Sequence, residues 1–111
     1  MTVLQSINEG STAYLTASFE DEDGVAVVPD SITYRIDCLT SGTVIRNNTS
    51  VTPATSIEIK LTPGDNVIVN PGTYCVSELR LVTVEAVLGD NDVITEEYKY
   101  AVKSLLKVSR I

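Results

Sequence analysis

Apolar and polar side chains alternate along most of this chain, with the period of two that is typical of half-buried β-strands. In segment 12–19, for example, Ala13, Leu15, Ala17 and Phe19 fall on one face, and Tyr14, Thr16 and Ser18 on the other. The alternation predicts strands at 12–19, 32–38, 43–46, 56–61, 79–88 and 93–102, with a short seventh at 3–7. The apolar faces should form the core, with Tyr34, Tyr98 and Tyr100 among the buried side chains.

Turn signals separate these strands about every ten residues. Glycine, proline and charged residues mark loops at 20–31 and 63–74, and the second loop opens on Pro63-Gly64-Asp65, which favours a turn or a single helical turn. Thr40-Ser41-Gly42 and residues 89–92 mark hairpin turns, and 47–54 is also turn-rich. No helical pattern intervenes that could connect parallel strands. The sequence therefore predicts an all-β fold, an antiparallel immunoglobulin-like β-sandwich of about seven strands over residues 1–102.

Two cysteines distinguish this sandwich from an antibody domain. Cys38 lies on the third predicted strand and Cys75 just before the sixth, so they do not reproduce the antibody disulfide, and the chain has no tryptophan for the antibody core. The favoured interpretation is that both cysteines are free thiols that are buried or half-buried. A nonstandard disulfide is the alternative, and two sulfurs without histidine fall short of a zinc site.

Composition and charge limit the classes of partner that this chain is expected to bind. A chain of 111 residues suits a single domain, and its apolar runs are far shorter than the ~20 residues of a membrane span. The first ten residues show no secretory signal pattern. A net charge of −7 would repel a phosphate backbone, so we expect neither nucleic acid nor membrane as a partner.

No catalytic constellation is visible. The chain contains no histidine, which removes the usual nucleophilic triads, so we expect no enzyme, no cofactor and no metal. The acidic run 20–23 lacks the spacing of an EF-hand and reads as a solvated loop, with calcium binding as the alternative. Glu96 and Glu97 read as charges that discourage edge pairing, and the overlapping glycosylation sequons at 47–50 read as a turn.

The segments INEGSTAYLTASFEDEDG, VVPDSITYRIDCLTSGTVI, SVTPATSIEIKLTPGDNVIV and EYKYAVKSL carry a family resemblance. Over residues 9–105 the chain resembles the small Ig-like structural proteins of tailed bacteriophages and prophages. The resemblance implies a non-enzymatic virion protein, for instance a head decoration protein or a head-tail accessory, that is assembled in the cytoplasm of the bacterial host. It implies as partners the major capsid protein or other virion proteins, and many symmetric copies or a homo-oligomer.

The segment Lys103–Ile111, which we call the cationic tail, is the most informative predicted surface. It alternates apolar with basic residues, and on an acidic chain it holds three of the eight basic side chains. We expect it to add a strand to a neighbouring subunit; the alternative is that it lengthens the last strand or covers its own core. The predicted partner-binding residues are Leu105, Leu106, Lys107, Val108, Arg110 and Ile111, with Val3 and Leu4 at the other terminus.

A second functional class stays open at this point. Similar sandwiches serve as adhesive modules, which would bind a carbohydrate or a host-surface receptor through their loops. Tyr14 and Tyr74 are the aromatic side chains that the strand pattern leaves free to stack on a sugar.

Overall fold

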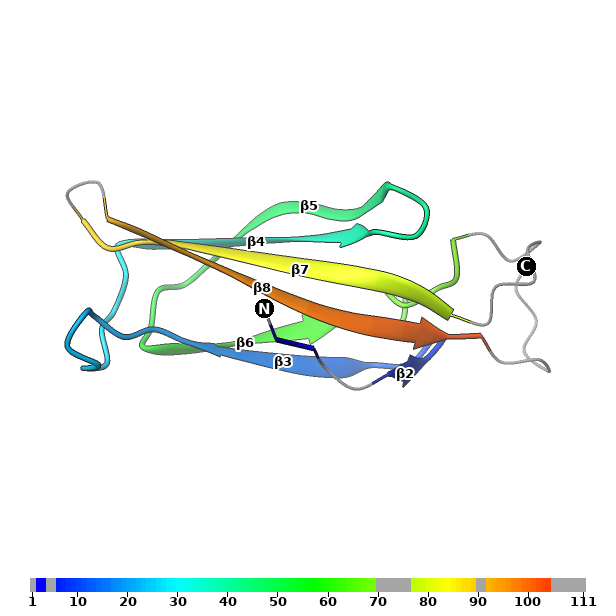
Figure 1. The fold of residues 1–111 in the computed structure, drawn as a ribbon, viewed down its shortest axis with the longest axis horizontal. Helices are drawn as coiled ribbons and strands as arrows, with labels where there is room; N and C mark the ends of the chain where they lie inside the picture. The colour runs from blue at the N-terminus through cyan, green and yellow to red at the C-terminus, as the bar shows by residue number, and fades with distance from the viewer. Residues whose placement is uncertain (1, 4–5, 70–76, 90–91, 105–111) are drawn as a thin grey trace.

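The computed structural model describes residues 2–3, 6–69, 77–89 and 92–104. These residues form two β-sheets that face each other in an elongated molecule of 49 × 22 × 20 Å (Figure 1). The strands are β1 (Thr2–Val3), β2 (Ile7–Asn8), β3 (Ala13–Ser18), β4 (Ser31–Cys38), β5 (Thr43–Val51), β6 (Ser56–Leu61), β7 (Ser77–Val87) and β8 (Val93–Lys103). The all-β sandwich predicted from the alternation is confirmed.

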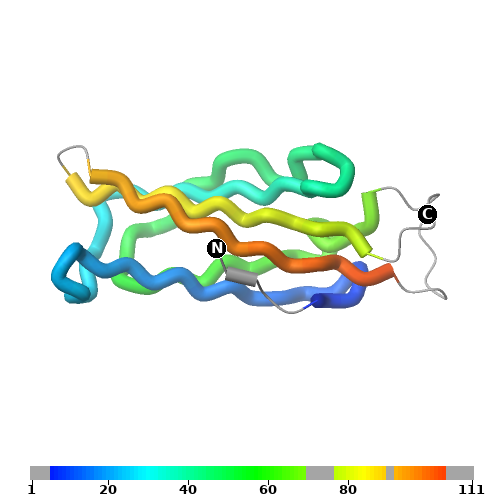
Figure 2. Tube along the Cα trace, viewed as in Figure 1, coloured from blue at the N-terminus to red at the C-terminus, as the bar shows by residue number. Residues whose placement is uncertain are grey.

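The larger sheet has the order β1-β8-β7-β4-β5, and the smaller sheet contains β3 and β6. Strands β7 and β8 run along most of the length of the molecule and pair from Ser77↔Lys103 to Val87↔Val93 (Figure 2). Connections cross between the sheets after β2, β3, β5 and β6, so that strands close in sequence contribute to both layers. The β3–β6, β4–β5, β4–β7 and β7–β8 pairings are antiparallel.

The predicted N-terminal strand is split into two short pieces. Thr2 and Val3 pair with Tyr98 and Lys99, and Ile7 and Asn8 pair with Val102 and Lys103. Both pairings are parallel: β1 and β2 lie along the outer edge of β8 and run in the same direction as β8. Counted as one interrupted strand, β1 and β2 bring the number of strands in the described part of the chain to seven, as expected.

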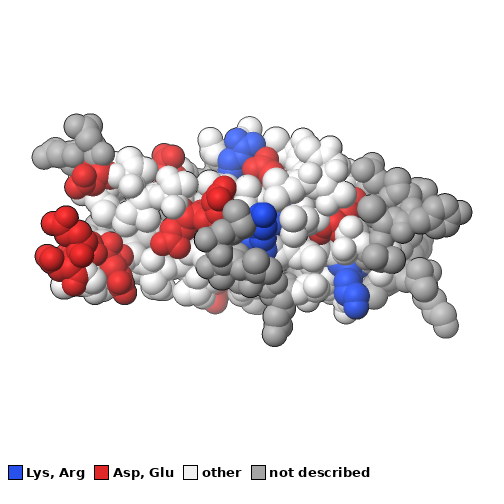
Figure 3. All heavy atoms as spheres, in the orientation of Figure 1, with Lys and Arg blue, Asp and Glu red and all other residues white. Residues whose placement is uncertain are grey.

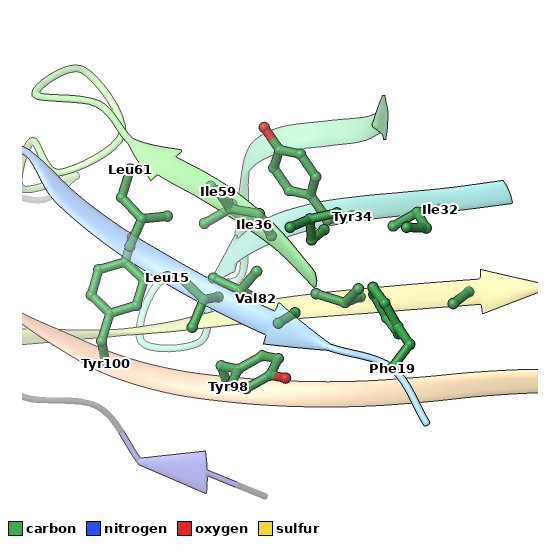
Figure 4. Packing of buried hydrophobic residues seen from close by; sticks show 14 of the residues in the cluster. Leu15, Phe19, Ile32, Tyr34, Ile36, Ile59, Leu61, Val82, Tyr98 and Tyr100 are labelled. Carbon is green, nitrogen blue, oxygen red and sulfur yellow. The ribbon is translucent and has the colours of Figure 1, made fainter. Parts of the chain in front are cut away.

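The core lies between the sheets and uses the predicted alternate positions. Leu15, Ile36, Ile59 and Val82 come from four different strands and are at most 3% exposed. Figure 4 shows these side chains interdigitating with Tyr34, Tyr98 and Tyr100, which are buried as expected. The hydrophobic contact between the layers is the principal stabilising term in a sandwich of this size.

The prediction of a turn at 47–54 is wrong for residues 47–51, because β5 continues to Val51. Strand β4 offers a continuous partner there, with Thr33 opposite Ser50 and Tyr34 opposite Thr49. The turn-forming hydrogen bonds of the sequence persist inside the strand: Asn47 Oδ1 accepts from the Asn48 amide at 2.8 Å. These hydrogen bonds lie near the shifts of register between β4 and β5 at Ile36. The turn preference of the two asparagines therefore produces an irregular strand and not a turn. The sequons therefore lie on an edge strand and not in a turn.

Candidate interaction surfaces

Of the predicted partner-binding residues, the structure describes only Val3. Val3 lies in β1, where its backbone pairs opposite Lys99. Leu4, Leu105, Leu106, Lys107, Val108, Arg110 and Ile111 lie outside the described residues. Strand β8 extends through Lys103, one residue beyond the predicted boundary of the sandwich. Docking by the cationic tail thus stays a prediction, and the structure instead defines the surfaces that a partner would meet.

Strand β5 forms one edge of the larger sheet. Within the described residues it pairs only with β4, so the backbone groups on its other side have no strand partner over nine residues. Exposed edges usually carry lysine, proline or inward-pointing charge that prevents pairing with another chain. The only charge on β5 is Arg46, and Val44 beside it is 48% exposed. This edge carries no outward charge, while the inward-pointing Arg46 and the register shifts against β4 limit how regularly a further strand can pair with it.

Arg46 leaves the edge free because its guanidinium turns toward the other sheet. It donates hydrogen bonds to the Tyr34 hydroxyl at 2.7 Å and to the carboxylate of Asp65, and it lies 5.9 Å from the centre of the Tyr34 ring. Burial opposes the charge of Arg46, but the hydrogen bond to Tyr34 and the negative charge of Asp65 outweigh it and raise the pKa. Arg46 thereby ties β5 to the segment after β6.

The smaller sheet has two open edges. In the described part of the chain β3 and β6 pair only with each other, over six residues each. The outer face presents Tyr14, which is 59% exposed, opposite Lys60. Tyr14 is the exposed aromatic that the alternation predicts, whereas Tyr74 lies beyond the described ranges.

Strand β8 is covered along only part of its outer edge. β1 and β2 pair with it at residues 98–99 and 102–103, while within the described residues 93–97 pair only with β7. Glu96 and Glu97 lie on this free stretch, where their charge disfavours pairing with an acidic or uncharged strand and not with a basic one. The carboxylate of Glu96 accepts a hydrogen bond from the Tyr98 hydroxyl at 2.7 Å. Burial, with this hydrogen bond, raises the pKa of Tyr98 to about 12.

A groove opens beside this free stretch, between the start of β8 and the chain that follows β3. It has a volume of about 480 Å³. Apolar side chains and carboxylates line it, and no basic residue does; the lining residues are Glu20, Asp21, Glu22, Leu88, Asp92, Val93 and Ile94. We call it the acidic groove. Figure 3 shows the acidic side chains gathered at this end of the molecule, and the visible basic ones nearer the middle and the other end.

The loop that forms one wall of the acidic groove is held in place by its own hydrogen bonds. Asp21 Oδ1 accepts from the amides of Asp23 and Val25 at 2.9 and 3.0 Å, and Gly24 adopts the positive φ of 79° that closes the turn. All four carboxylates of 20–23 are exposed, as the solvated-loop reading predicts. Among the described residues no group of three ligands that could hold a metal ion is present.

The opposite end of the sandwich contains charged residues that the sequence analysis missed. Glu78 and Arg80 are 1% and 0% exposed, and their side chains face the interior from β7. Arg80 donates at 3.0 Å to Glu78 Oε1, at 3.0 Å to the sulfur of Cys38, and at 2.7 Å to the carbonyl of Val67. Glu78 Oε1 also accepts from the amide of Val69 at 2.8 Å. We call these groups the buried ion cluster; they pin segment 67–69 across the end of the core.

A second set of polar contacts closes the same end. Asn66 is fully buried and donates to the carbonyl of Ser11 at 2.7 Å, while its Oδ1 accepts from the Tyr100 hydroxyl at 2.9 Å. Burial is the main cause that raises the pKa of Tyr100 to about 12. The predicted Pro-Gly-Asp turn is present, and its Asp65 carboxylate caps the turn by accepting from Thr62 N at 2.8 Å.

The period of two contained the signal for the buried ion cluster. Continued backward from Val82, the inward face of β7 passes through Arg80 and Glu78. A charge at an inward position indicates a buried pair or a site. Cys38 belongs to the same cluster: it is free and buried, as expected, and Cys75 lies outside the residues that the structure describes.

Comparisons with protein-family models, with curated proteins and with solved structures found no match. In the described part of the chain no helix is long and apolar enough to cross a membrane.

Proposed function

We propose that this chain is a non-enzymatic structural component of a tailed-phage virion, of the head decoration or head-tail accessory kind. In this role it binds neighbouring virion subunits, and further copies of itself, through strand edges, loops and chain ends. The sequence resemblance over residues 9–105 motivates the assignment to a virion. The immunoglobulin-like reading of the fold is supported by the order β8-β7-β4-β5 packed on β3-β6, which is the order that sandwiches of this class use for their central strands.

The observation that carries the binding role is the open edge of β5. Nine residues of backbone without an outward charge are a suitable template for main-chain pairing with a partner strand. Assembly by this means needs no pocket, and the rigid sandwich holds the edge in shape. Many weak contacts of this kind become strong on a particle because symmetry repeats them.

Mass spectrometry of particles purified from cells that carry this gene tests the proposal. We expect the chain in stoichiometric amounts relative to the major capsid protein: hundreds of copies place it on the shell, and a dozen or fewer at the neck or tail. Absence from purified particles, while the protein accumulates in the cell, contradicts the proposal.

An adhesive role is the second candidate, and the exposure of Tyr14 is the observation that favours it. An exposed aromatic ring on a flat sheet, next to Lys60, is a surface on which a sugar can stack. A glycan array separates the two functions. Binding that the substitution Tyr14→Ala abolishes favours the adhesive role, and a blank array favours the assembly role.

A further inference from the structure

We propose that the acidic groove of one copy receives the cationic tail of a second copy, so that the chains associate head to tail. The inference rests on the proposed function, since it names the surface on which one of the predicted chain ends docks. Its structural basis is the combination of a free strand edge, an apolar floor and an acidic rim at the same end of the molecule.

The backbone of β8 provides the first part of the site. Its residues 93–97 have no strand partner on the outer side within the described residues, whereas β1 and β2 pair with residues 98–99 and 102–103. A short added strand would continue the sheet along residues 93–97. Strand addition of this kind derives its affinity from main-chain hydrogen bonds and its selectivity from alternate side chains.

The side chains around this edge provide the second part. Leu88, Val93 and Ile94 form an apolar floor, and Val93 is 53% exposed. The volume of about 480 Å³ lies within the range of about 300–1,000 Å³ found for small-ligand sites, so it accommodates a few side chains and not a folded domain. An extended segment that inserts a few side chains fits this volume.

The sequence of the cationic tail complements both features. In an extended conformation Leu106 and Val108 fall on one face and Lys107 on the other. One face then suits the apolar floor, while Lys103, Lys107 and Arg110 supply positive charge for a rim formed by Glu20, Asp21, Glu22 and Asp92. Complementary charge of this kind steers association and selects against wrong partners.

The geometry of the fold indicates that the tail comes from another copy. β8 leads away from the groove, and its nine residue steps from Ile94 to Lys103 span about 30 Å. Val108 follows Lys103 by only five residues, so a fully extended chain carries it at most about 18 Å back. Leu106 and Val108 therefore cannot reach the groove of their own chain. A contact between different surfaces of identical chains generates open filaments or rings, depending on whether the rotation closes.

Sedimentation velocity of the full chain over a range of concentrations tests the inference. We expect self-association that weakens strongly in about 1 M salt, where the Debye length falls to about 3 Å. Glu22→Lys should weaken the association about tenfold, because it places a like charge beside the incoming tail. Glu58→Lys is the matched control: it makes the same charge change at an exposed position on β6, away from the groove, and should leave the association unchanged.

Charge exchange identifies the partner surface. Lys107→Glu should also weaken self-association, and a mixture of the Glu22→Lys and Lys107→Glu chains should associate better than either variant alone. Far-ultraviolet circular dichroism establishes that each variant is folded. A chain that stays monomeric at low salt, equal effects of Glu22→Lys and Glu58→Lys, or a mixture without rescue each contradict the inference.

The two proposals fail separately. A monomeric chain that is abundant in purified particles refutes tail-in-groove docking and leaves the virion role standing. A chain that self-associates through the groove but is absent from particles refutes the virion role alone.

Discussion

The two ends of the sandwich contain the same kinds of charged residue and use them in opposite ways. At one end Glu78 and Arg80 are fully buried and held by hydrogen bonds to each other and to the backbone. At the other end Glu20–Asp23 are exposed carboxylates with no basic residue lining the groove beside them. Buried pairs specify how the chain closes its core, whereas unpaired surface charge of one sign is available to a partner. The comparison thus separates an end that stabilises the fold from an end that is suited to contact.

The largest effect should follow from breaking the buried ion cluster. Arg80→Met leaves the carboxylate of Glu78 buried without its cation, and we expect the free energy of unfolding to fall by about 3–5 kcal/mol. Urea denaturation measures the change. Arg35→Met is the control, because the Arg35–Asp37 pair is partly exposed and its loss should cost no more than about 1 kcal/mol. Equal losses for the two variants would contradict a special role of the cluster.

Asn66→Leu should have the next largest effect. It removes the partner of the Tyr100 hydroxyl and of the Ser11 carbonyl, and each buried group left without a hydrogen bond costs about 1–3 kcal/mol. The same denaturation assay applies. Asn48→Leu, on the exposed edge of β5, should change stability by about 0.5 kcal/mol or less. A loss of stability as large as that of Asn66→Leu would contradict the explanation.

Alkaline pH should lower the free energy of unfolding through Tyr100, whose hydroxyl donates to Asn66 at the end of the sandwich opposite the acidic groove. Its pKa is raised from 10.0 to about 12, chiefly by burial, so the folded chain keeps a proton that the unfolded chain releases. The stabilisation is complete below about pH 10 and is lost as the pH rises to about 12, on the order of 1–2 kcal/mol. Absorbance of the phenolate at 295 nm checks this. If all the tyrosines of the folded protein ionise together near pH 10, as in the denatured chain, the prediction fails.

The smallest effect on stability should come from the acidic end. Asp23→Lys relieves repulsion among exposed carboxylates, and we expect a gain of at most about 0.5 kcal/mol that disappears in high salt. Thermal unfolding at low and high ionic strength measures it. A loss of several kcal/mol would mean that the acidic loop takes part in holding the fold together.

Most of the fold could be predicted from the sequence because one face of nearly every strand is apolar. The alternation placed β3, β6 and the inward face of β4 correctly, since burial against a second sheet requires the period of two. It failed at residues 47–51, where pairing with β4 overrides the turn preference of the two asparagines. Pairing with a strand distant in the chain is a tertiary effect that local composition does not contain.

The candidate surfaces were less accessible to sequence reasoning. The acidic groove combines the loop after β3 with the start of β8, about seventy residues apart in the chain, so only the folded topology brings them together. The buried ion cluster was hidden for a different reason. Charged residues are expected to be exposed, and the alternation that places Arg80 inside had to be weighed against that expectation.

Hydrogen exchange of the full chain at low and high protein concentration tests the central comparison most directly. Residues 93–97 and 19–22 should become more protected as the concentration rises, because a neighbouring tail then covers the free edge and the groove. Residues 66–69 and 78–80 should be equally protected at both concentrations. Protection that does not change with concentration at residues 93–97, or that changes only at residues 66–69 and 78–80, would contradict the account.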